Sequence, residues 1–94
     1  FDTIFDVRCA QDAGRPPVVC RAAVARADGA AVVVVTFPNG FARTLTLADG
    51  EFLRGNPTMS GTGTDTDWRL TDGTYYIRVD DQRFELPARL VFEN

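Results

Sequence analysis

The stretch CRAAVARADGAAVVVVTFPNGFARTLTLADGEF, Cys20–Phe52, decides the fold because three turn signals divide it into segments of alternating hydrophobicity. Asp28-Gly29 and Asp49-Gly50 can supply the two positive-φ positions of a hairpin loop. Pro38-Asn39-Gly40 fits a three-residue loop that ends with a glycine in the left-handed region. Each loop length fixes a strand register, which the hydrophobic pattern then tests.

Large apolar side chains meet across the strands in the registers that these turns impose. The expected pairs are Val24 with Val33, Ala22 with Val35, Cys20 with Phe37, Phe37 with Phe41, Val33 with Leu45, Ala31 with Leu47, and Leu47 with Phe52. Nearer the C-terminus, a turn at Asp72-Gly73 pairs Leu70 with Tyr75 and Trp68 with Ile77, and a turn at Asp81-Gln82 pairs Val79 with Phe84 and Ile77 with Leu86. Apolar residues on one face through five successive turns predict an antiparallel meander.

Both ends of the chain alternate in the same way. One face is expected to carry Thr3, Phe5, Val7 and Cys9, and a C-terminal strand would align Phe84, Leu86, Ala88, Leu90 and Phe92. Pro87 lacks a ladder donor and should lie at an edge or a bend. No segment predicts a helix, because alanine-rich Ala22–Ala27 runs into a hairpin turn. We therefore expect a single all-β domain over residues 1–94, with about eight antiparallel strands in a small barrel or a two-layer sandwich.

Composition argues against several classes of function. The chain has 94 residues and a net charge of −3, and all ten of its cationic residues are arginine, with no lysine or histidine. No block of basic residues suggests a nucleic-acid footprint. The longest apolar run, Ala30–Val35, is far shorter than the ~20 residues that span a bilayer. We expect no nucleic-acid partner and no membrane span.

The two cysteines, Cys9 and Cys20, could form a redox pair, half of a metal site or a disulfide. A redox pair would stand closer together at a helix N-terminus, and zinc would need more ligands than a chain without histidine offers. A disulfide needs only two neighbouring strands, and closing a loop of about twelve residues would stabilise the fold by roughly 3 kcal/mol. We predict this disulfide rather than two free thiols, and with it a periplasmic or secreted location. The start at Phe1 without an initiating methionine fits a chain that has lost a signal peptide, or a shortened chain.

The segment RGNPTMSGTGTDT, Arg54–Thr66, is the one long polar stretch that is not a tight turn. Loops of this length are either functional or plain flexible connectors. As a recognition loop on a rigid barrel, it would present four residues to a partner: Met59, Ser60, Gly61 and Thr62.

Two other functions of this segment can be weighed. A calcium site could use Asp65 and Asp67, with Asp72 nearby in the sequence, although the spacing matches no complete calcium-loop motif. A phosphate cradle at Gly61-Thr62-Gly63 is not expected, because no helix follows it.

The outward face of the central strands is unusually free of charge. It carries Ala23, Ala25, Val32, Val34, Thr36, Ala42, Thr44 and Thr46. Such a face is expected to be covered by the ends of the chain or by a second sheet. The alternative is a flat surface around Val34 and Thr44 that binds a protein or forms a homodimer.

Catalysis is not expected. Serine or cysteine nucleophiles usually need a neighbouring histidine, and Schiff-base chemistry needs lysine, and the chain has neither. Among carboxylates, Asp80-Asp81 is typical of a solvated turn, and Glu85 should pair with a cross-strand arginine such as Arg78. We expect a protein that is not an enzyme and that uses no cofactor or metal.

Most of the chain resembles small exported proteins of proteobacteria that carry no assigned activity. The likeness rests on Cys9, Cys20, the strand Ala31–Val35, the turn Pro38-Asn39-Gly40 and the phrase Arg83-Phe84-Glu85-Leu86-Pro87. It implies export and this type of fold, but no particular function.

Ser60-Gly61, followed by Trp68, is similar to the inserted loop of the periplasmic inhibitors of c-type lysozyme. Those proteins are small antiparallel β-barrels that place a Ser-Gly loop in the lysozyme cleft. This chain lacks the tyrosine that follows Ser-Gly in that family and the later Lys-Gly element. The resemblance implies a barrel with an inhibitory loop. We therefore expect an exported, non-catalytic domain that binds another protein, as an inhibitor of an envelope hydrolase. The alternative is a structural or accessory envelope domain.

Overall fold

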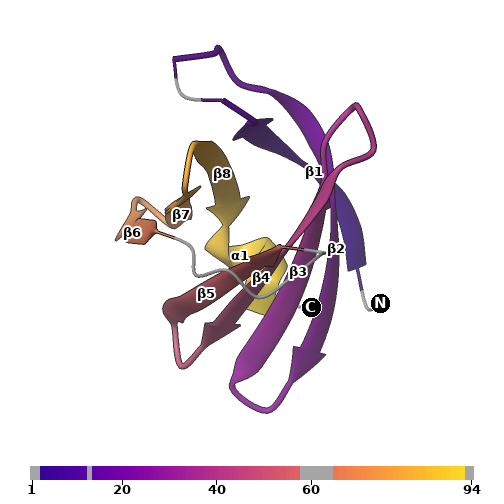
Figure 1. The fold of residues 1–94 in the computed structure, drawn as a ribbon. Helices are drawn as coiled ribbons and strands as arrows, with labels where there is room; N and C mark the ends of the chain where they lie inside the picture. Colours follow the sequence, from indigo (N-terminus) through magenta and orange to yellow (C-terminus); the bar gives the residue numbers. More distant parts are fainter. Residues whose placement is uncertain (1–2, 13, 58–64, 93–94) are drawn as a thin grey trace.

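The computed structural model describes residues 3–12, 14–57 and 65–92, which contain eight strands and one short helix (Figure 1). The strands are β1 (Thr3–Ala10), β2 (Val18–Ala27), β3 (Ala30–Thr36), β4 (Ala42–Ala48), β5 (Glu51–Pro57), β6 (Thr66–Thr71), β7 (Thr74–Val79) and β8 (Gln82–Pro87). The helix, α1, spans Ala88–Phe92. No helix in these described ranges is long and apolar enough to cross a membrane.

The strands form one antiparallel sheet in the order β5-β4-β3-β2-β1-β8-β7-β6. The chain makes two meanders, β1–β5 and β6–β8, and the pairing of β1 with β8 joins them. The sheet curls into a nearly closed barrel (Figure 1), whose end strands β5 and β6 come from the middle of the chain. The all-β prediction is confirmed, and the barrel is the correct choice over the sandwich.

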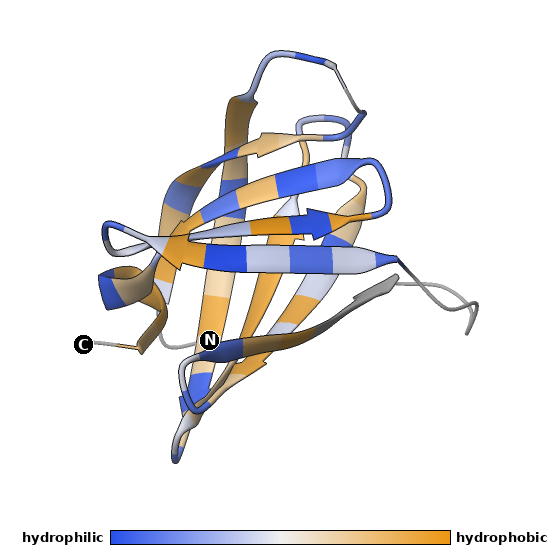
Figure 2. Cartoon of the chain, turned by 90° about the vertical axis from the view of Figure 1, so that its left-hand side faces the viewer, coloured by the Kyte–Doolittle hydropathy of each residue, from blue (hydrophilic) through white to orange (hydrophobic). Residues whose placement is uncertain are grey.

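The barrel interior is filled by alternate residues of the strands, and the hydropathy colours change along each strand accordingly (Figure 2). Val24, Val33 and Leu45 lie side by side on β2, β3 and β4 in the predicted register, and none of them has exposed surface. Leu70 lies opposite Tyr75 as predicted, yet 49% of it is exposed. The reason is that β6 pairs with β7 alone among the strands that the structure describes.

Two of the predicted hairpin turns have the expected backbone. At Asp49-Gly50 the φ angles are 54° and 80°, and at Asp72-Gly73 they are 52° and 78°. Two consecutive positive φ angles are the type I′ pattern, which glycine adopts without a steric cost. Gly29 and Gly40 also have positive φ, whereas Asp28 does not, so the first hairpin turn is of another type.

Cys9 on β1 and Cys20 on β2 form the predicted disulfide, with Cα atoms 6.0 Å apart. Cys9 lies opposite Val18, and Cys20 lies opposite Val7, so the bridge runs diagonally across the ladder. Both cysteines face the core and are 2% exposed. The bridge therefore joins the two strands at the centre of the sheet order.

The predicted turn at Asp81-Gln82 is wrong by one residue. The turn residues are Asp80-Asp81, with Asp80 at a φ of 52°, and Gln82 is the first residue of β8. The observed pairs are Val79 with Gln82, Ile77 with Phe84 and Tyr75 with Leu86, in place of Val79 with Phe84 and Ile77 with Leu86.

The predicted C-terminal strand ends at Pro87, and Ala88–Phe92 forms α1 instead. Pro87 stops the ladder as expected, since it has no amide donor. The helical turn places Val91 in the core with no exposed surface. Arg26 of β2 donates hydrogen bonds to the carbonyl oxygens of Leu90 and Val91, at 2.6 and 2.9 Å. A short apolar run fits both the helical and the strand period, and these tertiary contacts select the helix.

Candidate binding surface

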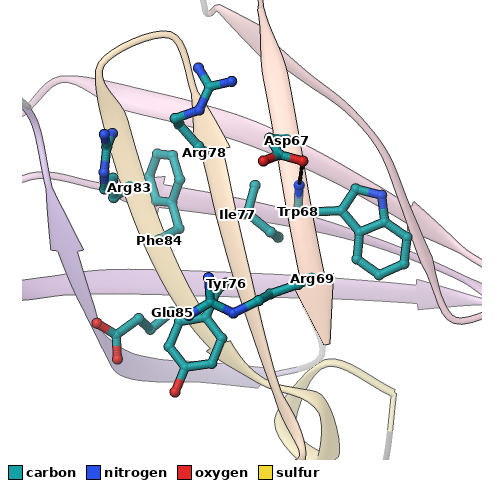
Figure 3. A pocket seen from close by; sticks show the side chains of 9 residues that line it. All are labelled: Asp67, Trp68, Arg69, Tyr76, Ile77, Arg78, Arg83, Phe84 and Glu85. Atoms are coloured by element: carbon teal, nitrogen blue, oxygen red, sulfur yellow. Dashed lines mark hydrogen bonds between the residues drawn. The ribbon is translucent and has the colours of Figure 1, made fainter. Parts of the chain in front are cut away.

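The outer face of β6, β7 and β8 carries a groove of about 280 Å³ (Figure 3). Its lining combines charged and aromatic side chains: Asp67, Trp68, Arg69, Tyr76, Ile77, Arg78, Arg83, Phe84 and Glu85. The volume lies at the lower limit for small-molecule pockets, which are roughly 300–1,000 Å³. It suits one or a few protein side chains better than a whole cofactor.

Strand register explains why these side chains gather. The two outward rows set by antiparallel pairing are Asp67, Arg78 and Arg83, and then Arg69, Tyr76 and Glu85. Successive residues of a strand point to opposite faces, so the row between them faces the core. Ile77 and Phe84 of that inner row are 2% and 1% exposed. The groove is therefore a polar surface on a well-packed part of the barrel.

Arg69 stacks on Tyr76, with its guanidinium carbon 4.5 Å from the ring centroid. Such a cation–π contact contributes about 0.5–1 kcal/mol at an exposed site and limits the motion of both side chains. A stacked guanidinium keeps its in-plane donors available for a carboxylate. The pair is thus suited to bind an acidic side chain of a partner.

Arg78 and Arg83 lie at the other end of the groove. Arg78 donates to the Asp65 carboxylate at 3.2 Å and to the Asp80 carbonyl oxygen at 3.1 Å. Arg83 donates to the Asp81 carbonyl oxygen at 3.2 Å. Three arginines and two carboxylates line the groove, so it is locally positive on a chain whose net charge is −3.

The predicted ion pair between Glu85 and Arg78 is not formed. The Glu85 carboxylate lies 4.0 Å from the Arg8 guanidinium of β1, and Glu85 is opposite Tyr76 on β7. The one-residue difference in the Asp80-Asp81 turn moves β8 by two residues relative to β7. Pairing of β1 with β8 then sets Arg8 opposite Glu85.

The residues of the predicted recognition loop, Met59, Ser60, Gly61 and Thr62, lie outside the described residues. The predicted cation ligands have other partners. The Asp65 carboxylate pairs with Arg78, and the Asp67 carboxylate accepts a hydrogen bond from the Trp68 amide at 2.9 Å. In the described ranges, no three cysteine or carboxylate side chains gather as a metal-binding group.

The uncharged outer face of β2, β3 and β4 is open to solvent. Ile4, Ala23, Val34 and Thr44 form one cross-strand row on it. Ile4 is 60% and Val32 is 36% exposed. The expected cover by the ends of the chain or by a second sheet is therefore absent from the described part of the molecule.

A buried polar pair inside the barrel was missed by the sequence analysis. Arg43 is 5% and Gln82 is 8% exposed, and the Arg43 Nε donates to the Gln82 Oε1 at 2.7 Å. Burial lowers the pKa of Arg43, and the charge of Asp80 acts in the opposite direction. The Arg43 Nη1 has no hydrogen-bond partner among the described residues. The one signal in the sequence was alternation, because Arg43 has the parity of core-facing Leu45.

No protein-family model, curated protein or solved structure gives a significant match to this chain.

Proposed function

We propose that this chain is an exported, non-catalytic domain that binds another protein through the outer face of β6–β8, and that it acts as an inhibitor of an envelope hydrolase. The observation that carries the proposal is the gathering of Arg69, Tyr76, Arg78 and Arg83 around one groove. Tyrosine and arginine are the residue types that dominate the energetics of protein interfaces. The excess of arginine favours a partner with an acidic surface.

The scaffold supports binding by this face. All the residues of the groove stand on three hydrogen-bonded strands, and the Arg69–Tyr76 stack orders two of the side chains before a partner arrives. Ordering before binding reduces the entropy lost on association. The predicted recognition loop, residues 54–66, is shorter than expected, because residues 54–57 belong to β5 and Thr66 begins β6. The rest of the segment directly precedes β6 in the sequence.

The Cys9–Cys20 disulfide supports export. Disulfides persist in oxidising compartments and are rare in the cytosol. A periplasmic or secreted location would also bring the chain to the envelope hydrolases that we propose as partners.

Titration of the full chain against c-type lysozymes and other envelope hydrolases tests the proposal. We expect dose-dependent inhibition that weakens as salt concentration rises, because arginine contacts are screened. Tyr76→Ala and Arg83→Ala should each weaken binding by about tenfold or more. Thr44→Arg lies on the outer face of β4 and does not line the groove, so it is the matched control and should bind like the wild type.

Two results would contradict the proposal. One is the absence of any partner, both in the panel and in a pull-down from periplasmic extract. The other is loss of binding in Thr44→Arg while Tyr76→Ala still binds, which would place the site on the uncharged sheet face.

The loop needs a separate variant. Replacing Met59-Ser60 by Gly-Gly should abolish partner binding and leave the melting temperature nearly unchanged, if the loop carries the contact that the sequence predicted. Retained binding in this variant, with loss in Tyr76→Ala, would assign the contact to the groove alone.

The open face around Val34 and Thr44 favours a second function, that of a structural or accessory envelope domain. An uncharged, partly exposed sheet face can pack against a larger assembly without charges to bury. Under this alternative, Thr44→Arg should release the chain from its assembly, and no hydrolase should be inhibited.

A further inference from the structure

β6 is an edge strand, and its outer side pairs with no described strand. β5 and β6 are the two ends of the sheet and lie on the same side of the barrel (Figure 1), with no ladder between them. The unpaired amides and carbonyls of an edge strand are a template for another strand. The side chains and backbone groups of β6 determine which strand can pair with it.

Hydrogen bonding in the β6–β7 hairpin determines which backbone groups of β6 point outward. The Asp80 amide donates to the Asp65 carbonyl oxygen at 2.7 Å, so Asp65 and every second residue after it direct their backbone groups toward β7. Thr66, Trp68 and Leu70 therefore direct theirs away from β7. The Trp68 amide is consistent with this, because it donates to the Asp67 carboxylate rather than to β7. A carbonyl of a new strand could take the place of that carboxylate.

The core-facing side chains of β6 are also incompletely covered. Trp68 and Leu70 lie opposite Ile77 and Tyr75 of β7, which are each 2% exposed. Leu70 is 49% exposed and Trp68 is only partly buried. A strand added to β6 would bury this apolar surface as well as pair the backbone.

The charges of Asp67 and Arg69 make β6 complementary to a second copy of itself. If two β6 strands pair antiparallel about Trp68, then Asp67 of each copy lies opposite Arg69 of the other. Thr66 lies opposite Leu70 in the same register, so all the outward backbone groups of β6 find partners. Other registers that keep the same backbone groups paired shift one β6 strand along the other by two residues or a multiple of two. Each of these registers sets Asp67 opposite an aspartate, sets Arg69 opposite the other Arg69, or forms no opposite-charge pair. Only the register about Trp68 forms two opposite-charge pairs and no like-charge pair.

We propose that two copies of this chain associate through antiparallel pairing of their β6 strands about Trp68. The contact is self-complementary, as a two-fold dimer requires. The sheet continues from β6 of one copy into β6 of the other, so both grooves lie on one outer face. The dimer does not depend on the proposed hydrolase partner, nor on the Val34 and Thr44 face.

Sedimentation of the full chain from micromolar to millimolar concentration tests this dimer, with three charge variants. The wild type should dimerise reversibly. Asp67→Arg and Arg69→Asp each set like charges opposite one another at two places, and each should raise the dimer dissociation constant by about tenfold or more. The double variant Asp67→Arg with Arg69→Asp restores both opposite-charge pairs and should dimerise like the wild type. Thermal melting checks that every variant is folded.

Thr44→Arg is the matched control, since it places a new charge on β4, which takes no part in the β6 contact, and it should remain dimeric. Amide hydrogen exchange adds a second measurement: dimerisation should protect Thr66 and Leu70, whose amides point outward, much more than Asp67 and Arg69. A wild type that stays monomeric at millimolar concentration would overturn the proposal. So would a double variant that stays monomeric, or loss of the dimer in Thr44→Arg alone. Each of these results would leave the hydrolase assays of Tyr76→Ala unaffected, so the two proposals fail independently.

Discussion

Removal of the Cys9–Cys20 disulfide should lower the melting temperature of this protein by about 15 °C. The bridge joins β1 to β2, and both cysteines are 2% exposed in the core. Reduction removes one covalent bond and no heavy atom, so the folded barrel should keep nearly all its other contacts. The main effect of reduction is therefore on the unfolded chain, which gains the freedom to open a loop.

The magnitude follows from the length of that loop. The cysteines are 11 residues apart in sequence. Closing a loop of about twelve residues removes roughly 9 to 10 cal/mol/K of chain entropy, which is about 3 kcal/mol at 25 °C. A domain of this length has an unfolding entropy of roughly 200 cal/mol/K near its melting temperature, so a loss of about 3 kcal/mol corresponds to about 15 °C.

Scanning calorimetry of the oxidised protein, the fully reduced protein and the Cys9→Ala/Cys20→Ala variant measures the effect. The reduced protein and the variant should both melt well below the oxidised protein, and reductant should not change the melting of the variant. Intact mass before and after reduction checks the bridge itself, because the oxidised chain is lighter by two hydrogens. Two free thiols in freshly purified protein, or a shift below about 5 °C on full reduction, would refute the reasoning.

Three further predictions concern single residues in the barrel. Gly73→Ala should lower the free energy of unfolding by about 1–2 kcal/mol, because a φ angle of 78° is strained for alanine, although no atom lies within 4 Å of the new Cβ. Gly73→Asn should lower it by less, since asparagine tolerates this conformation better. Equal losses for the two variants in urea titration would contradict this explanation. Tyr75 donates a hydrogen bond to the Gly50 carbonyl oxygen at 2.7 Å, and burial raises the pKa of Tyr75. The contribution of the neutral Tyr75 side chain to stability is therefore complete below a pH of about 10, the unfolded-state pKa, and is lost as pH rises through the higher folded-state pKa. Unfolding between neutral and alkaline pH should therefore show a smaller alkaline loss in Tyr75→Phe than in the wild type, and parallel curves would argue against it. Arg43→Met should cost about 1–3 kcal/mol by leaving the Gln82 Oε1 without its donor, while Arg43→Met with Gln82→Met should recover most of that loss; additive losses in a double-mutant cycle would show that the two side chains are not coupled.

Local features of this fold could be predicted because each depends on residues close together in the chain. Asp49-Gly50 and Asp72-Gly73 have the backbone that their residue types favour, and the turns then determine the pairing of their own hairpins. Cys9 and Cys20 could be paired for the same reason, since β1 and β2 are consecutive strands.

The candidate groove was only partly predictable. The sequence predicts separate roles for Asp67, Arg78 and Glu85, as a cation ligand or as members of an ion pair, but it does not place them on one surface. Their row depends on the β7–β8 register, and Gln82 alters that register by facing the core. The parity of Arg43 indicates that its side chain faces the core, but nothing near Gln82 in the sequence indicates its partner, because Arg43 is 39 residues away in the chain.

The sequence by itself determined the all-β class, the hairpin turns other than Asp80-Asp81, the disulfide and the alternation that fills the core. These follow from short-range sterics and from the two-residue period of a strand. Tertiary structure decided the pairing of β1 with β8, the buried Arg43–Gln82 pair, the α1 helix after Pro87 and the free edge of β6. The β1–β8 pairing, the Arg43–Gln82 pair and the contacts of α1 with Arg26 each join segments far apart in the chain. Such contacts form only where closing the barrel gains enough burial and hydrogen bonding to offset the entropy of loop closure. The edge position of β6 follows from the same closure, because β6 pairs with β7 alone among the described strands.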